Sequence, residues 1–300
     1  MTQQNRSGYF YAFGAALALS ASFVFSKSVL NSISMVQFGF VWFLLGVIWN
    51  SAWYISQKQY QQFKKNTRQR LSVAVSIAIL EAAATGLFYI AINAMENPAV
   101  VSFIGNIGPV FVTILGVTLL KERFGRWQIV GISVTILGVF VINFKGQAFG
   151  GFLEPGAIYV IFASMLFALA TITGRKYNKH LDPGLMSLIR SVMLATVFAV
   201  LILKSNEALR FEWPIWRDLA IGSIFETLLT IVFAYQALKR IEATSTSLII
   251  SSKGVWTLVL AWIFLGVFPT GMQLIGGILT LVGVYLITVK GIQSSRKSDR

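Results

Sequence analysis

Apolar residues occur in long runs along the chain, and short polar segments separate these runs. A helix that crosses a bilayer needs about 20 predominantly apolar residues, and ten runs approach that length. The predicted spans are 8–28, 35–56, 71–92, 98–120 and 127–144, followed by 155–173, 184–203, 218–238, 243–266 and 272–289. The pattern therefore predicts an all-α polytopic membrane protein with ten transmembrane helices.

Composition supports lipid as the solvent of this chain. Of its 300 residues, 56% are hydrophobic and 12% are charged, whereas a soluble domain carries about 25% charged residues. Cysteine is absent and His180 is the single histidine, which excludes a disulfide framework and a multi-histidine metal site. No P-loop and no HExxH motif is present, so no ATP hydrolysis, no zinc proteolysis and no cofactor is expected.

The net charge of +14 is unevenly placed rather than typical of a nucleic-acid-binding protein. With the N-terminus in the cytoplasm, the cytoplasmic segments hold eighteen Lys and Arg residues and the external segments hold five. Cytoplasmic loops of membrane proteins carry such an excess. The sequence therefore predicts an integral protein of the inner or plasma membrane with both termini cytoplasmic.

The two halves of the chain repeat each other at an offset of 145 residues. The pattern E-x3-T-x2-F begins at Glu81 in the third span and again at Glu226 in the eighth. The same offset aligns the glycines of the fifth span, Gly131 and Gly138, with Gly276 and Gly283 of the tenth. Because five spans is an odd number, the second copy enters the membrane from the opposite side. Inverted repeats of this kind are typical of secondary transporters.

Three features of the sequence resemble the drug/metabolite transporter superfamily with paired EamA-type domains. They are the segment SFIGNIGPVFVTILGVTLLKERFGRWQIVG at 102–131, the segment SFVFSK at 22–27, and the glycine-spaced last helix of each half. The resemblance covers roughly residues 8–290. It implies one five-helix EamA-like repeat over 8–144, a second over 155–290 and a cytoplasmic tail over 291–300. The second half departs from the family pattern, because Val255 stands in place of the expected proline.

The resemblance implies that the chain exports or exchanges amino acids, drugs or other small metabolites. Nucleotide-sugar or sugar-phosphate carriage is the alternative, because some relatives transport those solutes. A membrane sensor or scaffold and a membrane-embedded enzyme are the rivals outside transport, and sparse histidine and absent cysteine argue against the enzyme.

Four charged residues lie inside predicted spans and away from the span ends: Glu81, Glu226, Arg190 and Lys253. A charge at the bilayer centre costs about 2.5–3.5 kcal/mol on insertion scales, so these side chains should face the bundle interior or a watery cavity. They are candidates for contact with substrate or protons. The alternative is structural pairing, for example between Glu226 and Lys253.

Helix-breaking residues occur at matching places in the fourth and ninth spans. Gly105, Gly108 and Pro109 interrupt the fourth span, and Gly254 follows Lys253 in the ninth. Paired interruptions in the two halves point to a transporter site, although a kink that only shapes packing remains the alternative.

Polar and aromatic side chains near these interruptions are further candidates for the site. Asn106 and Ser252 could hydrogen-bond a ligand or bridge helices, and Trp256 could form an aromatic wall. The sequence thus predicts a secondary transporter that works by alternating access around a central cavity lined by spans three, four, eight and nine, with span one contributing. Its expected partners are a small-molecule substrate, the lipid bilayer, and a proton or counter-substrate, with a monomer or homodimer as the assembly.

Overall fold

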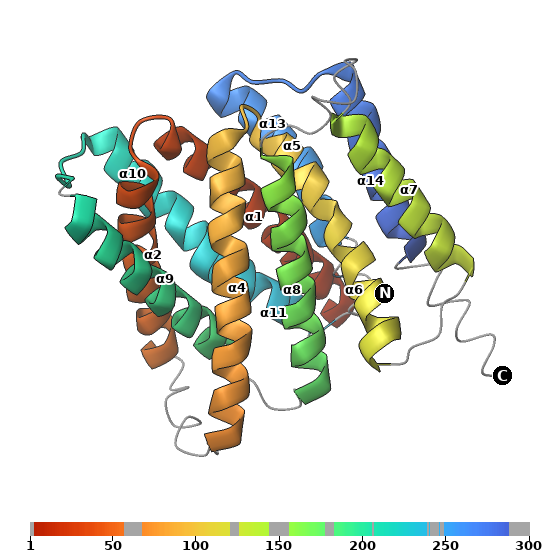
Figure 1. The fold of residues 1–300 in the computed structure, drawn as a ribbon, viewed down its shortest axis with the longest axis horizontal. Helices are drawn as coiled ribbons and strands as arrows, with labels where there is room; N and C mark the ends of the chain where they lie inside the picture. The colour runs from red at the N-terminus through yellow and green to blue at the C-terminus, as the bar shows by residue number, and fades with distance from the viewer. Residues whose placement is uncertain are drawn as a thin grey trace.

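The computed structural model describes residues 3–56, 68–120, 126–143, 156–177, 183–205, 207–238, 240, 246 and 249–287. Within these residues the chain is helical and contains no strand, and its helices correspond to ten successive spans (Figure 1). The predicted all-α polytopic membrane architecture is therefore confirmed. The predicted tail at 291–300, His180 and most of the basic loop at 57–70 lie outside the described residues.

The first half supplies five spans. They are α1 (Gln3–Leu30), α2 (Met35–Ser56), α4 (Arg68–Ala94), a broken helix made of α5 (Pro98–Ile104), η1 (Gly105–Ile107) and α6 (Gly108–Leu120), and α7 (Arg126–Asn143). Asn97 caps α5, because its side chain accepts a hydrogen bond from the Ala99 amide. Pro98 then occupies the first helical position, where its missing N–H has no cost.

The second half supplies the other five. They are α8 (Ala157–Tyr177), α9 (Pro183–Ser205), a helix made of α10 (Trp213–Ile224), the π-helical turn η3 (Phe225–Leu229) and α11 (Thr230–Leu238), then α13 (Lys253–Leu265) and α14 (Gly271–Tyr285). Thr270 and Gln273 form a reciprocal capping box at the start of α14. Gly266, in the left-handed region at φ 67°, ends α13.

Length and composition fit these helices to a bilayer. Five described stretches are by themselves long and apolar enough to cross it: Arg6–Leu30, Met35–Ser56, Val75–Ala94, Pro98–Leu119 and Gly184–Ser205. Four shorter apolar helices accompany them: Arg126–Ile142, Ala157–Thr173, Ile249–Leu265 and Gly271–Tyr285. The remaining span, α10–η3–α11, carries Asp218 and Glu226 and is more polar.

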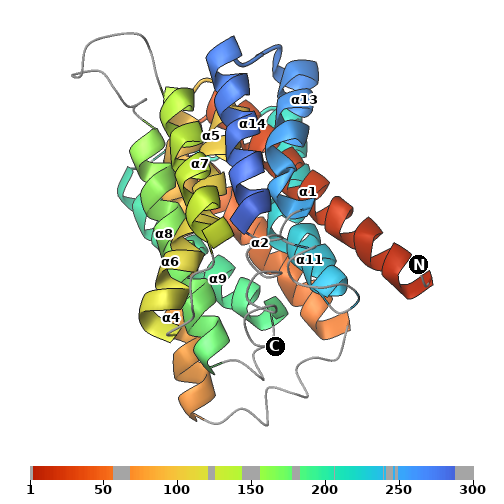
Figure 2. The same ribbon diagram turned by 90° about the vertical axis from the view of Figure 1, so that its right-hand side faces the viewer.

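Equivalent helices of the two halves make equivalent packing contacts. Helix α1 packs on α10, α11 and α13, and its counterpart α8 packs on the matching helices α4 and α6. Helix α2 packs on its own counterpart α9, and α7 packs on α14 (Figures 1 and 2). Exchanging the halves therefore leaves the packing pattern unchanged, as a two-fold relation between repeats requires.

Four glycines show that this relation is an inversion. A Cβ added at Gly131 would lie 2.7 Å from the Gly283 carbonyl oxygen, and one added at Gly276 would lie 2.6 Å from the Gly138 carbonyl oxygen. Since 131 pairs with 283 and 138 with 276, α7 and α14 run antiparallel, and each contact is the repeat equivalent of the other. The fold is thus two inverted five-helix repeats.

Candidate functional site

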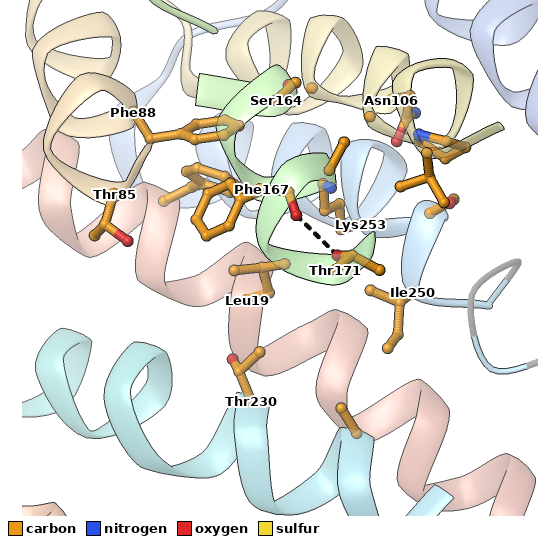
Figure 3. A pocket seen from close by; sticks show the side chains of 18 of the residues that line it. Leu19, Thr85, Phe88, Asn106, Ser164, Phe167, Thr171, Thr230, Ile250 and Lys253 are labelled. Atoms are coloured by element: carbon orange, nitrogen blue, oxygen red, sulfur yellow. Dashed lines mark hydrogen bonds between the residues drawn. The ribbon is translucent and has the colours of Figure 1, made fainter. Parts of the chain in front are cut away.

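A cavity of about 850 Å³ lies between the two halves of the bundle. Its wall comes mainly from α1, α4, η1, α6, α8 and α11. Single residues are added by α7 (Gln128), α9 (Arg190), η3 (Glu226) and α13 (Lys253). Figure 3 shows side chains of this wall, with Phe88, Phe167 and Lys253 among them. The predicted contributions of spans one, three, four, eight and nine are present. Helix α8, the sixth span, is an additional wall that the sequence did not predict.

Polar atoms on this wall lack protein partners. Within the described part of the chain, Thr85 Oγ1, Asn106 Oδ1 and Ser164 Oγ are buried without a hydrogen bond. Most buried polar groups in proteins are paired, so each unpaired one needs an explanation. Their common position on the cavity wall suits them to bind water or a solute.

The strongest polar contact at the cavity joins Arg190 to Glu226. Arg190 Nη2 donates a hydrogen bond of 2.9 Å to Glu226 Oε1, and the two side chains are 9% and 11% exposed. Arg190 Nε and Glu226 Oε2 have no partner among the described residues. Glu81 on α4 is close enough for its charge to interact with both groups. Pairing with Arg190 therefore replaces the Glu226–Lys253 pair offered as an alternative.

A π-helical turn presents Glu226 to the cavity. Its five residues, Phe225–Leu229, interrupt the eighth span, and the Thr230 hydroxyl and amide both donate to the Phe225 carbonyl oxygen. Ser187 of α9 donates a hydrogen bond of 2.9 Å to the Thr227 carbonyl oxygen. π-Bulges occur frequently at functional sites because they redirect side chains within a helix.

Lys253 begins α13 and is half-buried on the cavity wall. Its carbonyl oxygen accepts hydrogen bonds from the hydroxyls of Ser20 on α1, at 2.9 Å, and Thr257, at 2.8 Å. The backbone at this residue is therefore fixed by two helices. Among the described residues, no carboxylate forms an ion pair with its ammonium group.

The predicted break in the fourth span is a single 3-10 turn at Gly105–Ile107. The Gly108 amide bonds to the Gly105 carbonyl oxygen, and Pro109 has no amide hydrogen to continue the α-helical pattern. Gly105, Gly108 and Pro109 all line the cavity. A Cβ at Gly105 would lie 3.3 Å from the Phe88 ring, so this glycine brings the helix against that side chain.

Comparison with known proteins agrees with this architecture. A model of the EamA-like transporter family matches residues 6–144 and again 154–289, which together are nearly the whole chain. The chain belongs to the EamA-like transporter family. This EamA-like chain is thereby a membrane transporter of small molecules, as the resemblance of its fourth and fifth spans implied.

Similar proteins from several organisms are named as uncharacterized transporters. An uncharacterized transporter of Archaeoglobus fulgidus is 25% identical over 91% of this chain and 94% of its own. One of Synechocystis sp. is 26% identical over 79% of this chain and 71% of its own, and the uncharacterized transporter YyaM of Bacillus subtilis is 24% identical over 69% and 68%. The fold is also similar to that of a protein whose crystal structure is solved, with a TM-score of 0.67 and 14% sequence identity. The match covers 96% of this chain and 98% of that protein's chain, and it supports the fold alone.

The structure brings many of the sequence candidates together in this EamA-like protein. Seven line the cavity: Arg190, Glu226, Lys253, Asn106, Gly105, Gly108 and Pro109. Four lie outside the wall, namely Glu81, Ser252, Trp256 and Gly254. The Ser252 hydroxyl donates to the Ile249 carbonyl oxygen, and Trp256 packs edge-on against Phe13 with centroids 5.0 Å apart. The Phe103 ring packs against Gly254, where a side chain would clash because an added Cβ would lie 2.5 Å from the ring.

Side chains of α8 are the main part of the wall that sequence reasoning missed. Ser164, Phe167 and Thr171 lie at i, i+3 and i+7, so one face of this helix turns to the cavity. Phe167 contacts Phe88, with ring centroids 5.8 Å apart, and Phe88 contacts Phe23 of α1 at 6.1 Å. Helix α8 is the repeat counterpart of α1, which was expected to contribute to the cavity. The repeat was therefore the signal for α8 that the sequence contained.

Proposed function

We propose that this chain is a secondary transporter that exports small organic solutes by alternating access, without ATP hydrolysis by the chain itself. The observation that carries the proposal is a cavity of about 850 Å³ between two inverted repeats, with a few polar and charged groups on a mainly apolar wall. Transporters with inverted repeats bind substrate near the bilayer midplane at the repeat interface, often at broken helices. The proposed units are the repeats 8–144 and 155–290.

The volume and the lining suit a small organic molecule. Ligand pockets generally enclose about 300–1,000 Å³, with mostly apolar walls and a few polar groups. Here the walls are the rings of Phe23, Phe88 and Phe167, and the polar groups include Asn106 and Lys253. A water-filled channel would need no such mixture, so we favour a solute-binding site.

Asymmetry between the two ends supports an inward-facing state. On the face where α6 and α8 end and α7 begins, the cavity extends to Thr171 and Gln128. At the opposite face, Ser28 of α1 donates a hydrogen bond of 3.0 Å to Asp218 of α10, and Lys27 donates one of 3.2 Å to the Asn93 carbonyl oxygen at the end of α4. We name the Ser28–Asp218 and Lys27–Asn93 contacts the outer latch. With both termini in the cytoplasm, the latch closes the external end.

Reconstituted protein tests the proposal. Proteoliposomes would be loaded with radiolabelled phenylalanine, phenylacetate, glucose 6-phosphate or UDP-glucose, and efflux measured with and without a pH gradient. Thr171→Phe, which fills the cavity, should reduce efflux of the transported solute by about tenfold or more. Thr196→Phe is the matched control. Each threonine is exposed, and each donates a hydrogen bond of 2.8 Å to the carbonyl oxygen four residues before it.

Thr196 lies on α9 outside the cavity wall, so its phenylalanine variant should transport like the unmodified protein. Glu81→Gln and Glu226→Gln test proton coupling in the same assay, and at least one of them should change the response of efflux to the pH gradient. Binding of a solute without efflux would instead support a sensor or scaffold, and would contradict transport.

A further inference from the structure

The charged groups on the cavity wall do not cancel. Three of the described wall residues carry charges: Arg190, Glu226 and Lys253. Arg190 and Glu226 form an ion pair at 2.9 Å, so their charges neutralise each other. Among the described residues Lys253 has no acidic partner, so its positive charge on the wall is unpaired. Glu81 does not line the cavity, and its charge interacts with Arg190 and Glu226.

That charge is placed where it is costly. Residue 253 lies in the middle of the predicted span 243–266 and at the start of α13. A cation inside a membrane span is tolerated when it faces a cavity or a partner. The hydroxyls of Ser20 and Thr257 hold the backbone at this position, at 2.9 and 2.8 Å from the Lys253 carbonyl oxygen. A fixed backbone and an unpaired ammonium group together make an anchoring point for an anion.

Aromatic rings share the wall with this cation. Phe23, Phe88 and Phe167 form a chain of ring contacts, with centroids 6.1 and 5.8 Å apart, across α1, α4 and α8. Figure 3 shows Phe88, Phe167 and Lys253 on the wall of the same cavity. Such a wall favours an apolar, planar body over a sugar ring, whose hydroxyls would each need a hydrogen-bond partner.

We propose that Lys253 is the counter-ion for a carboxylate, so that the substrate class is a small organic monocarboxylate with an apolar or aromatic body. This inference rests on the proposed function and names its substrate class. The ammonium group of Lys253 donates to the carboxylate oxygens, and the unpartnered hydroxyl of Ser164 is a second donor on the wall. The body lies against the Phe88 and Phe167 rings.

The charge count separates this class from phosphate esters. A phosphate monoester carries about 1.5–2 negative charges at pH 7, whereas the described wall residues offer one unpaired positive charge. Arg190 does not supply a second, because Glu226 already compensates it. A phosphate monoester would therefore bring uncompensated negative charge into the cavity, and the sugar-phosphate alternative loses support.

Binding to the purified protein in detergent tests the inference without any transport step. The probes are phenylacetate, its uncharged amide phenylacetamide, and benzyl phosphate, which carries about 1.5–2 negative charges at pH 7. Each is titrated against intrinsic tryptophan fluorescence and thermal unfolding. Phenylacetate should bind at least about tenfold more tightly than phenylacetamide, as expected for a charge-assisted hydrogen bond. It should also bind more tightly than benzyl phosphate. Equal affinity for acid and amide, or no binding of phenylacetate, would overturn the inference.

Variants then assign the effect to one side chain. Lys253→Met should remove the preference for phenylacetate over phenylacetamide, while Lys253→Arg retains it because the positive charge remains. Lys204→Met, which removes an exposed lysine at the end of α9, is the control and should keep the preference. A preference that survives in Lys253→Met would assign the anion to another group. Carboxylate binding without efflux would overturn the transport proposal and leave this inference standing.

Discussion

Arg190 and Glu226 face each other across α9 and the π-helical turn, with Arg190 Nη2 2.9 Å from Glu226 Oε1. Glutamate in the eighth span is matched by Glu81 in the third, but the arginine has no such match. At the repeat offset of 145, Leu45 stands where Arg190 stands in the second half. The repeat therefore relates the helices of the two halves but does not extend to their charges.

The ion pair makes single and double substitutions distinguishable. Arg190→Met or Glu226→Met alone should strongly destabilise the protein, by about 3–5 kcal/mol, because the remaining charge is buried without a partner. Replacing both should restore much of the loss. Thermal unfolding in detergent measures this cycle. If the double variant were as unstable as the two losses added together, the pairing would be contradicted.

The glycine contacts predict a sharp contrast between positions. Gly276→Ala places a Cβ 2.6 Å from the Gly138 carbonyl oxygen, and backbone atoms cannot move aside without separating α7 from α14. A loss of about 1–3 kcal/mol is expected, as for other overpacked sites. Gly86→Ala is the control, since a Cβ there meets nothing within 4 Å. Its effect should be neutral or stabilising by up to about 1 kcal/mol.

Orientation is testable because the chain contains no cysteine. A single cysteine at Leu209, in the segment before α10, should react with a membrane-impermeant maleimide added outside intact cells. A single cysteine at Ser56, at the end of α2, should react after the cytoplasmic face is exposed in inverted vesicles. Leu209 is 37% exposed, so access does not limit its labelling. The reverse pattern would contradict cytoplasmic termini.

The outer latch should bias the conformational equilibrium. Asp218→Ala removes the acceptor of the Ser28 hydrogen bond, a contact of 3.0 Å between α1 and α10. A hydrogen bond contributes about 1 kcal/mol, so external access to the cavity should rise about fivefold. The readout is the labelling rate of a single cysteine at Ser164 from outside. Glu212→Ala, whose side chain makes no capping bond, should leave that rate unchanged. An unchanged rate in Asp218→Ala would show that this contact does not hold the external end closed.

The helices and their inverted repetition could be predicted from the sequence. Apolar runs set the spans, because a bilayer imposes a minimum length on each helix. The glycines at 131, 138, 276 and 283 marked the closest helix contact, because close approach of two backbones leaves no room for a side chain. These features depend on local composition and spacing, which a sequence displays directly.

Other parts of the site depend on how helices face one another. The E-x3-T-x2-F triplets made both Glu81 and Glu226 candidates for the site, yet Glu226 lines the cavity and Glu81 does not. The difference follows from the π-helical turn at Phe225–Leu229 and from Arg190 beside it. Nothing in a run of apolar residues indicates an extra residue in a helical turn. Likewise, the inward face of α8, with Ser164 and Phe167, becomes apparent only when α8 is packed on α4.

Alternating access means that the cavity becomes accessible in turn from each side of the membrane. A single cysteine at Ser164, labelled with an impermeant maleimide, tests this most directly, because thiols react with maleimide in water as thiolates. Labelling from both faces is predicted, whereas a single cysteine at Ile278, which is 62% exposed on the outer surface of α14, should stay unmodified in lipid. Labelling of Ser164→Cys from neither face, or from one face alone, would contradict alternating access.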